Sequence, residues 1–132
     1  MSADRAALRR VLEAGEREGG SVEFKERLTR SVHLTDGRLE SLVAQLRHRV
    51  LSGDGKATYV VGVTDNGGIA GIPPEAFSES MDVLSLIAEE AGAHIDEVRT
   101  WGVADDGTVT RGETRPWHRF RSRSCSASIS GS

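Results

Sequence analysis

The sequence contains a single cysteine, Cys125, among its 132 residues. An internal disulfide framework and a cysteine-based zinc site are therefore excluded. Aromatic residues make up only 5% of the chain, which limits the large side chains available for a core. No apolar run approaches the roughly 18 residues of a membrane span, and the first residues lack the apolar core of a signal peptide. The sequence predicts a small cytoplasmic chain of about one domain, with no membrane contact.

Lysine is also scarce, because Lys25 and Lys56 are the only two among 17 basic residues. The net charge of −3 hides an asymmetry between the two ends of the chain. Residues 1–110 hold twelve basic and nineteen acidic side chains, whereas residues 111–132 hold five arginines and one glutamate. An acidic body is therefore followed by a basic, serine-rich tail.

Three segments follow from composition and periodicity. Residues 1–20 predict an N-terminal helix, because Ala7, Leu8, Val11 and Leu12 recur on one side before Gly19-Gly20 ends it. Residues 21–110 predict an α+β domain. Residues 111–132 form an Arg/Ser-rich tail in which we find no apolar periodicity, and we predict that this tail is disordered.

The pattern between residues 22 and 103 alternates strands and helices. Alternating or β-branched stretches predict strands, and apolar residues at 3-4 spacing predict helices. The expected strands are 22–28, 57–63, 69–72 and 93–103, and the expected helices are 39–50 and 75–91. The order is strand, helix, strand, strand, helix, strand, which is the ferredoxin-like split βαβ pattern.

Turns and caps complete this expectation. Asp65-Asn66-Gly67-Gly68 is the strongest turn signal and predicts a hairpin, because Asn and Gly accept positive φ. We expect Thr35 or Asp36 to cap the helix predicted at 39–50, and Ser78 or Ser80 to cap the helix predicted at 75–91.

The sequence predicts no catalytic, cofactor-binding or metal-binding residue. A phosphate-binding loop needs a Lys and a hydroxyl after its second glycine, but Gly68 and Ile69 follow Gly67. The four histidines do not fall in a metal-ligand spacing such as H-E-x-x-H.

Basic side chains are the remaining candidates for contact with nucleic acid or a partner. For the basic side chains of residues 21–110, the alternative to nucleic-acid or partner contact is a solvated surface with salt bridges. In the tail, arginines interleaved with Trp117 and Phe120 favour RNA binding by charge and stacking, and an unstructured extension is the alternative. The candidates are Lys25, Arg27, Arg47, Arg49, Arg119, Arg121 and Arg123.

The segment from Leu39 to Ile72 resembles the region before the GTPase domain in the GTP-binding protein 1 and 2 group, translational GTPases related to elongation factor 1-alpha. The resemblance spans roughly residues 20–100. It is carried by Glu23-Phe24-Lys25, Leu42, Gln45, Leu46, Arg49, Val50, Gly53-Asp54-Gly55, Gly62-Val63, Asp65-Asn66-Gly67, Gly71-Ile72, Ala88 and Gly92-Ala93.

This resemblance implies a non-catalytic accessory domain. In the family, GTP and magnesium are bound downstream, at a G-x-V-D-x-G-K-S/T loop that this chain lacks. The implied partners are a GTPase domain in the same protein, RNA or the ribosome. The similarity fades after Trp101, and we expect a chain that stops early, by truncation or a frame change near residues 105–115.

A second resemblance implies another role. Glu23-Phe24-Lys25 and the Gly62 to Ile72 segment are also similar to the AlbA-like domain of Schlafen-type proteins. That resemblance implies a free-standing module that binds RNA or DNA.

Overall fold

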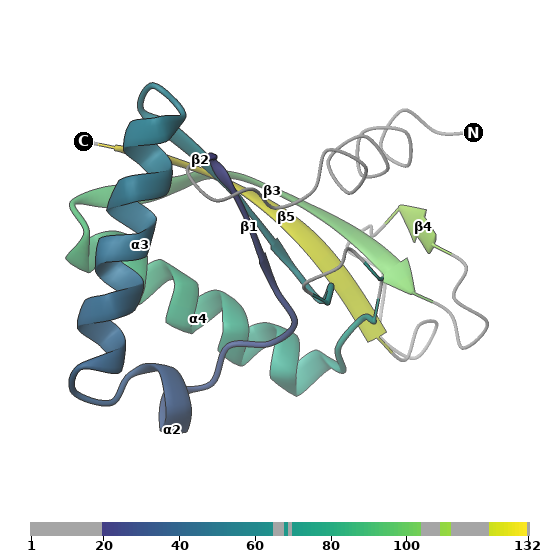
Figure 1. Cartoon of the computed structure of the whole chain (residues 1–132). Coiled ribbons are helices and arrows are strands. Elements are labelled where there is room, and N and C mark those ends of the chain that lie inside the picture. The colour runs from purple at the N-terminus through teal and green to yellow at the C-terminus, as the bar shows by residue number, and fades with distance from the viewer. Residues whose placement is uncertain (1–19, 65–67, 69, 104–108, 112–121, 132) are drawn as a thin grey trace.

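A computed structural model describes residues 20–64, 68, 70–103, 109–111 and 122–131 (Figure 1). The helix predicted within residues 1–20 lies outside the described residues. None of the described helices is long and apolar enough to cross a membrane. The elements are β1 (Val22–Lys25), α2 (Arg30–His33), α3 (Arg38–Ser52), β2 (Lys56–Val61), α4 (Pro74–Glu90), β3 (Ala93–Val103), β4 (Val109–Arg111) and β5 (Ser122–Gly131).

The described strands form one mixed sheet in the order β1-β2-β5-β3-β4. Strand β1 runs parallel to β2, while β2 and β3 both run antiparallel to β5. The unit β2–α4–β3 is therefore a split βαβ unit with β5 inserted between its two strands. This arrangement confirms the predicted α+β class and its split βαβ character.

The inserted strand comes from an unexpected part of the chain. We predicted a returning strand at 69–72, but residues 70–72 form no regular strand. The backbone N–H groups of Ala70 and Gly71 instead both donate to the carbonyl of Gly62, at 2.9 and 2.8 Å. The position beside β2 is taken by β5.

The prediction of a disordered tail is wrong for Ser122–Gly131, because this segment is the central strand of the sheet. Its side chains alternate. Ala127 and Ile129 are fully buried against the helices, while Ser126, Ser128 and Ser130 alternate with them and are half-buried. Apolar residues alternate with the serines, and this period-two pattern is typical of a strand with one buried face.

Helices α3 and α4 cover one face of the sheet (Figure 1). The larger apolar cluster lies there and includes Leu46 of α3, Leu84 of α4 and Tyr59 of β2. A smaller cluster of Phe24, Val60, Val63 and Trp101 is also buried. Phe24 pairs with Val60 in the register while Glu23 pairs with Tyr59, so the two clusters lie on opposite faces.

The predicted helix caps are wrong. Helix α3 begins after Gly37, whose φ of +78° favours glycine, and α4 begins after Pro73; neither position makes a side-chain capping bond. Ser80 instead lies buried inside α4. Its Oγ accepts a hydrogen bond from the Leu28 N–H at 3.0 Å and donates one to the Leu28 carbonyl at 3.2 Å. It thereby fixes the segment after β1 against α4.

Candidate partner-binding site

Two of the predicted contact residues, Lys25 and Arg49, meet around the carboxylate of Glu23. Arg49 Nε and Nη2 lie 2.9 and 2.8 Å from Glu23 Oε2, and Lys25 Nζ lies 3.3 Å from Oε1. Arg49 Nη1 also donates to the Gly20 carbonyl at 2.8 Å. Arg49 is only 6% exposed and Glu23 only 3%. This burial places Arg49 inside the fold, where it joins α3 to β1, and not on the surface that the sequence suggested.

Arg27 lies on the surface and faces an acidic group of α4. Its Nη2 is 3.9 Å from Glu79 Oε1. The neighbouring Arg30 contacts Glu79 at 3.9 Å and Asp82 at 2.9 Å. Arg27 and Arg30 therefore pair with carboxylates of α4, which is the arrangement expected of a solvated surface with salt bridges.

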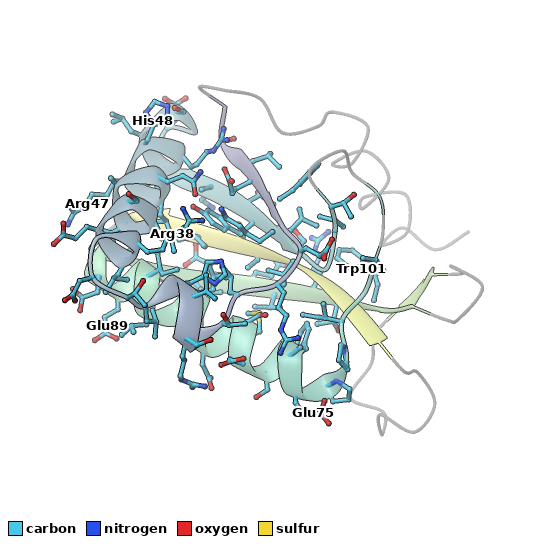
Figure 2. All side chains as sticks on the ribbon, turned by 60° about the horizontal axis from the view of Figure 1, so that its bottom comes forward. Arg38, Arg47, His48, Glu75, Glu89 and Trp101 are labelled. Atoms are coloured by element: carbon cyan, nitrogen blue, oxygen red, sulfur yellow. The ribbon has the colours of Figure 1, made fainter. Side chains whose placement is uncertain are left out.

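Arg47 is exposed and makes a different kind of contact (Figure 2). Its Nε donates to the Ala91 carbonyl at 3.4 Å and its Nη2 to the Glu90 carbonyl at 3.2 Å. Carbonyls at the end of a helix have no partner within the helix and carry partial negative charge. Arg47 therefore caps the end of α4 from the neighbouring α3.

The tail arginines are only partly placed. Arg123 lies on β5 opposite Gly102 of β3. Arg119 and Arg121 lie outside the described residues, so their predicted contact with RNA stays a prediction.

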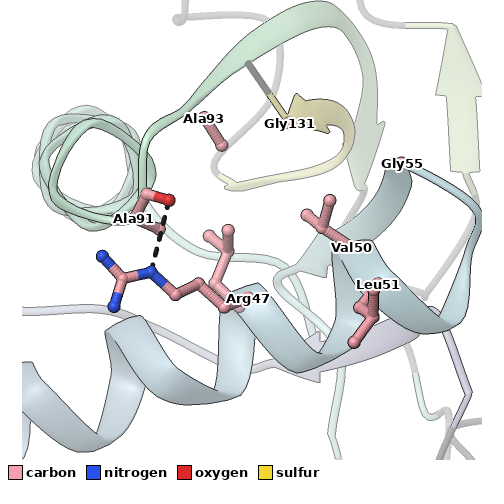
Figure 3. Close-up of a pocket in the computed structure, with 8 residues that line it drawn as sticks. Arg47, Val50, Leu51, Gly55, Ala91, Ala93 and Gly131 are labelled. Carbon is pink, nitrogen blue, oxygen red and sulfur yellow. Dashed lines mark hydrogen bonds between the residues drawn. The ribbon is translucent and has the colours of Figure 1, made fainter.

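Beside Arg47 the structure has an apolar pocket of about 200 Å³ (Figure 3). It lies where the ends of α3, α4 and β5 meet the start of β3. The lining residues are Leu46, Arg47, Val50, Leu51, Gly55, Ala91, Ala93 and Gly131. Sequence reasoning identified Arg47 but not the pocket, because small residues from several separate elements create the space together.

A tight turn between α3 and β2 shapes one side of this pocket. A Cβ atom at Gly53 would lie 1.8 Å from the Lys56 carbonyl oxygen, so no side chain fits there. Gly55 has a φ of +101°. Its carbonyl accepts a hydrogen bond from the Gly131 N–H at 3.0 Å, which ties the end of β5 to the turn. The C-terminal segment that we predicted to be disordered is therefore part of the pocket wall.

A small polar cluster lies near the start of β3. His94 Nε2 is 2.7 Å from Asp96 Oδ1, and the Ser130 hydroxyl donates to Asp96 Oδ2. The Ser130 hydrogen bond, followed by the charge of His94, holds the pKa of Asp96 below its ordinary value. The carboxylate lies between the hydroxyl and the imidazole, whereas a catalytic triad needs the imidazole in the middle. With the carboxylate in the middle, the cluster links β3 to β5 at the surface through the Asp96–Ser130 hydrogen bond.

Within the part of the chain that the structure describes, no group of three or more His, Cys, Asp or Glu side chains has the arrangement of a metal site.

Comparison with known proteins identifies relatives of this chain. It is 38% identical over 96 residues to GTP-binding protein 2 of mouse (Mus musculus) and 36% identical over 96 residues to GTP-binding protein 2 of human (Homo sapiens). Each match covers 73% of this chain but 15% of the relative, so the chain corresponds to a small part of those proteins. No protein-family model matches. No solved structure matches either.

The resemblance seen in the sequence is thereby confirmed. Glu23, Arg49 and the glycine turn are among the residues that carry the resemblance, and in this structure they hold the fold together. Over the matched 96 residues, the chain is similar to a segment of GTP-binding protein 2, which the sequence pattern predicted.

Proposed function

We propose that this chain is a non-catalytic accessory domain of a translation-associated GTP-binding protein. The observation that carries the proposal is its similarity to 15% of GTP-binding protein 2. Because the relative continues well beyond the matched segment, the rest of such a protein is the partner that we propose. In this proposal, GTP and magnesium are bound by another part of the longer protein, and this domain contributes recognition.

Most of the charged groups in the described residues hold the fold together, which leaves the pocket beside Arg47 as the feature that supports recognition. The charged groups of the Glu23 cluster serve packing, since they join α3 to β1. The Arg27 and Arg30 pairs join the segment after β1 to α4. The pocket beside Arg47 offers apolar contact and a cation on one surface, which is the composition of a protein-binding anchor site.

A titration with the partner tests the proposal. The full chain is labelled and titrated with mouse GTP-binding protein 2 from which the matching 96 residues have been deleted. Saturable one-to-one binding is expected. The alternative role, as a free-standing nucleic-acid module, predicts instead that the chain ignores this protein and binds single-stranded RNA with an affinity that falls steeply with salt.

The RNA titration needs a control that separates binding by the Arg/Ser-rich tail from binding by the folded domain. Because Ser122–Gly131 is the central strand, deletion of the tail would unfold the domain. Arg119 and Arg121 are therefore replaced by glutamine. RNA binding without partner binding would overturn the accessory role, and loss of that RNA binding in the double variant would assign it to the tail.

A further inference from the structure

We propose that the pocket beside Arg47 binds a polypeptide segment that carries one apolar side chain next to a carboxylate. This inference deepens the proposed function, on which it rests for the identity of the partner, by naming the surface and the chemistry that it recognises.

The pocket itself favours an apolar anchor. All lining residues except Arg47 are aliphatic side chains or glycine, and the volume of about 200 Å³ is many times that of a single water molecule. Leu51 at its edge is 79% exposed, the highest value among the large apolar side chains of the described residues. An apolar side chain seated here would remove both Leu51 and the pocket wall from water.

Arg47 favours an anionic neighbour for that anchor. Lys25, Arg27, Arg30, Arg49 and Arg99 each lie within 4.0 Å of a carboxylate. Among the described residues, Arg47 has no such partner, as is also true of Arg38 and Lys56, but only Arg47 lines the pocket. Its Nε and Nη2 donate to the Ala91 and Glu90 carbonyls. A guanidinium has five N–H donors in a planar fork, so Nη1 retains donors for a carboxylate. Figure 3 shows the Arg47 guanidinium beside the Ala91 carbonyl.

The chemistry of the pocket and the length of the relatives favour a polypeptide as the source of these two groups. Charge complementarity requires an anion beside an apolar group, and an aliphatic residue followed by Asp or Glu provides both. The relatives are several times longer than the segment that they share with this chain, so the remainder of such a protein is the source that this proposal names.

Two dyes test the pocket and its charge separately. The probes are 1-anilinonaphthalene-8-sulfonate, an apolar anion, and N-phenyl-1-naphthylamine, its neutral analogue. We expect both to bind the full chain. Arg47→Gln should weaken the anionic dye about three- to fivefold, as expected for a partly exposed ion pair, and leave the neutral dye within twofold. Ala93→Leu should fill the pocket and weaken both dyes. Arg27→Gln, on another surface, is the matched control and should change neither.

Displacement tests the polypeptide. The peptides acetyl-Ala-Leu-Asp-Ala-amide and acetyl-Ala-Leu-Asn-Ala-amide are titrated against the dye-loaded chain. The Asp peptide should displace the dye at lower concentration than the Asn peptide, and Arg47→Gln should abolish this difference. Equal displacement by both peptides, or dye binding that Ala93→Leu does not weaken, would overturn the proposal. Urea unfolding of each variant confirms that it remains folded. The dyes and peptides act without the mouse protein, so this outcome is independent of the partner titration above.

Discussion

Glu23 shows how a charged residue in a strand can be a core residue. Strand β1 has apolar side chains on one face and Glu23 and Lys25 on the other, which predicted a half-exposed strand. Glu23 is nevertheless buried, because α3 brings the Arg49 guanidinium onto its carboxylate. Arg49 lies 26 positions from Glu23 in the sequence, so their pairing depends on how α3 packs against β1. The periodicity of a strand does not predict that packing.

This cluster gives a stability prediction. Glu23→Ala should lower the free energy of unfolding by about 3–5 kcal/mol, because it leaves Arg49 buried without its carboxylate. Urea denaturation measures the change. Glu26→Ala, at an exposed position next to it, is the control and should stay within about 0.5 kcal/mol. A loss below about 1 kcal/mol for Glu23→Ala would show that the ion pair is not formed.

His33 gives a pH prediction. Burial, together with the charges of Arg38 and Lys25, lowers the pKa of His33 below its ordinary value of 6.5, despite an opposing hydrogen bond to the Thr29 backbone. The unfolded chain therefore binds the proton more readily than the folded chain. The contribution of neutral His33 to stability is present above pH 6.5 and is lost as the pH falls through the folded-state pKa.

The measurement is the free energy of unfolding at pH 7.5 and 5.5 for the wild type and for His33→Asn. The wild type should lose more stability than the variant between the two pH values. If the variant loses as much, another group titrates in this range and the burial of His33 is not responsible.

Among the elements, local sequence pattern was sufficient for α3, α4, β2 and β3. The two helices carry apolar residues at 3-4 spacing, β2 is a short β-branched and aromatic run, and β3 alternates imperfectly. The observed bounds of all four lie within a few residues of those predicted. Strand β5 was overlooked because Ala127 and Ile129 are separated by serines, and the composition of the tail outweighed the alternation. The returning strand predicted at 69–72 was assigned from a turn signal, although the place beside β2 went to a segment more than 50 residues later.

Strand β5 gives the prediction at this scale. Ile129→Ala should cost about 2–5 kcal/mol of unfolding free energy, because the side chain is fully buried beneath α3 and α4. Ser128→Ala, on the opposite face of the same strand, should change it by no more than about 0.5 kcal/mol. Two near-neutral substitutions would indicate that the segment is peripheral, as the composition of the tail first suggested.

At the scale of the whole molecule, the candidate site depends on parts of the chain that lie far apart in sequence. Arg47 could be named from the sequence because exposed arginines on a helix are visible in a periodic pattern. The pocket could not be named, since Gly55, Ala91, Ala93 and Gly131 have no signature until the sheet brings them together. The same assembly explains why Arg47 and Arg49, two positions apart, have different roles: one faces the pocket and the other lies inside the fold.

We propose that this domain recognises a partner while another part of the longer protein binds the nucleotide. Equilibrium titration of the full chain with a fluorescent GTP analogue and magnesium tests that division most directly. We predict a fluorescence signal that rises only linearly with ligand and that excess unlabelled GTP does not reduce. A saturable one-to-one curve that unlabelled GTP competes away would show that this chain itself binds the nucleotide, contrary to the proposed division.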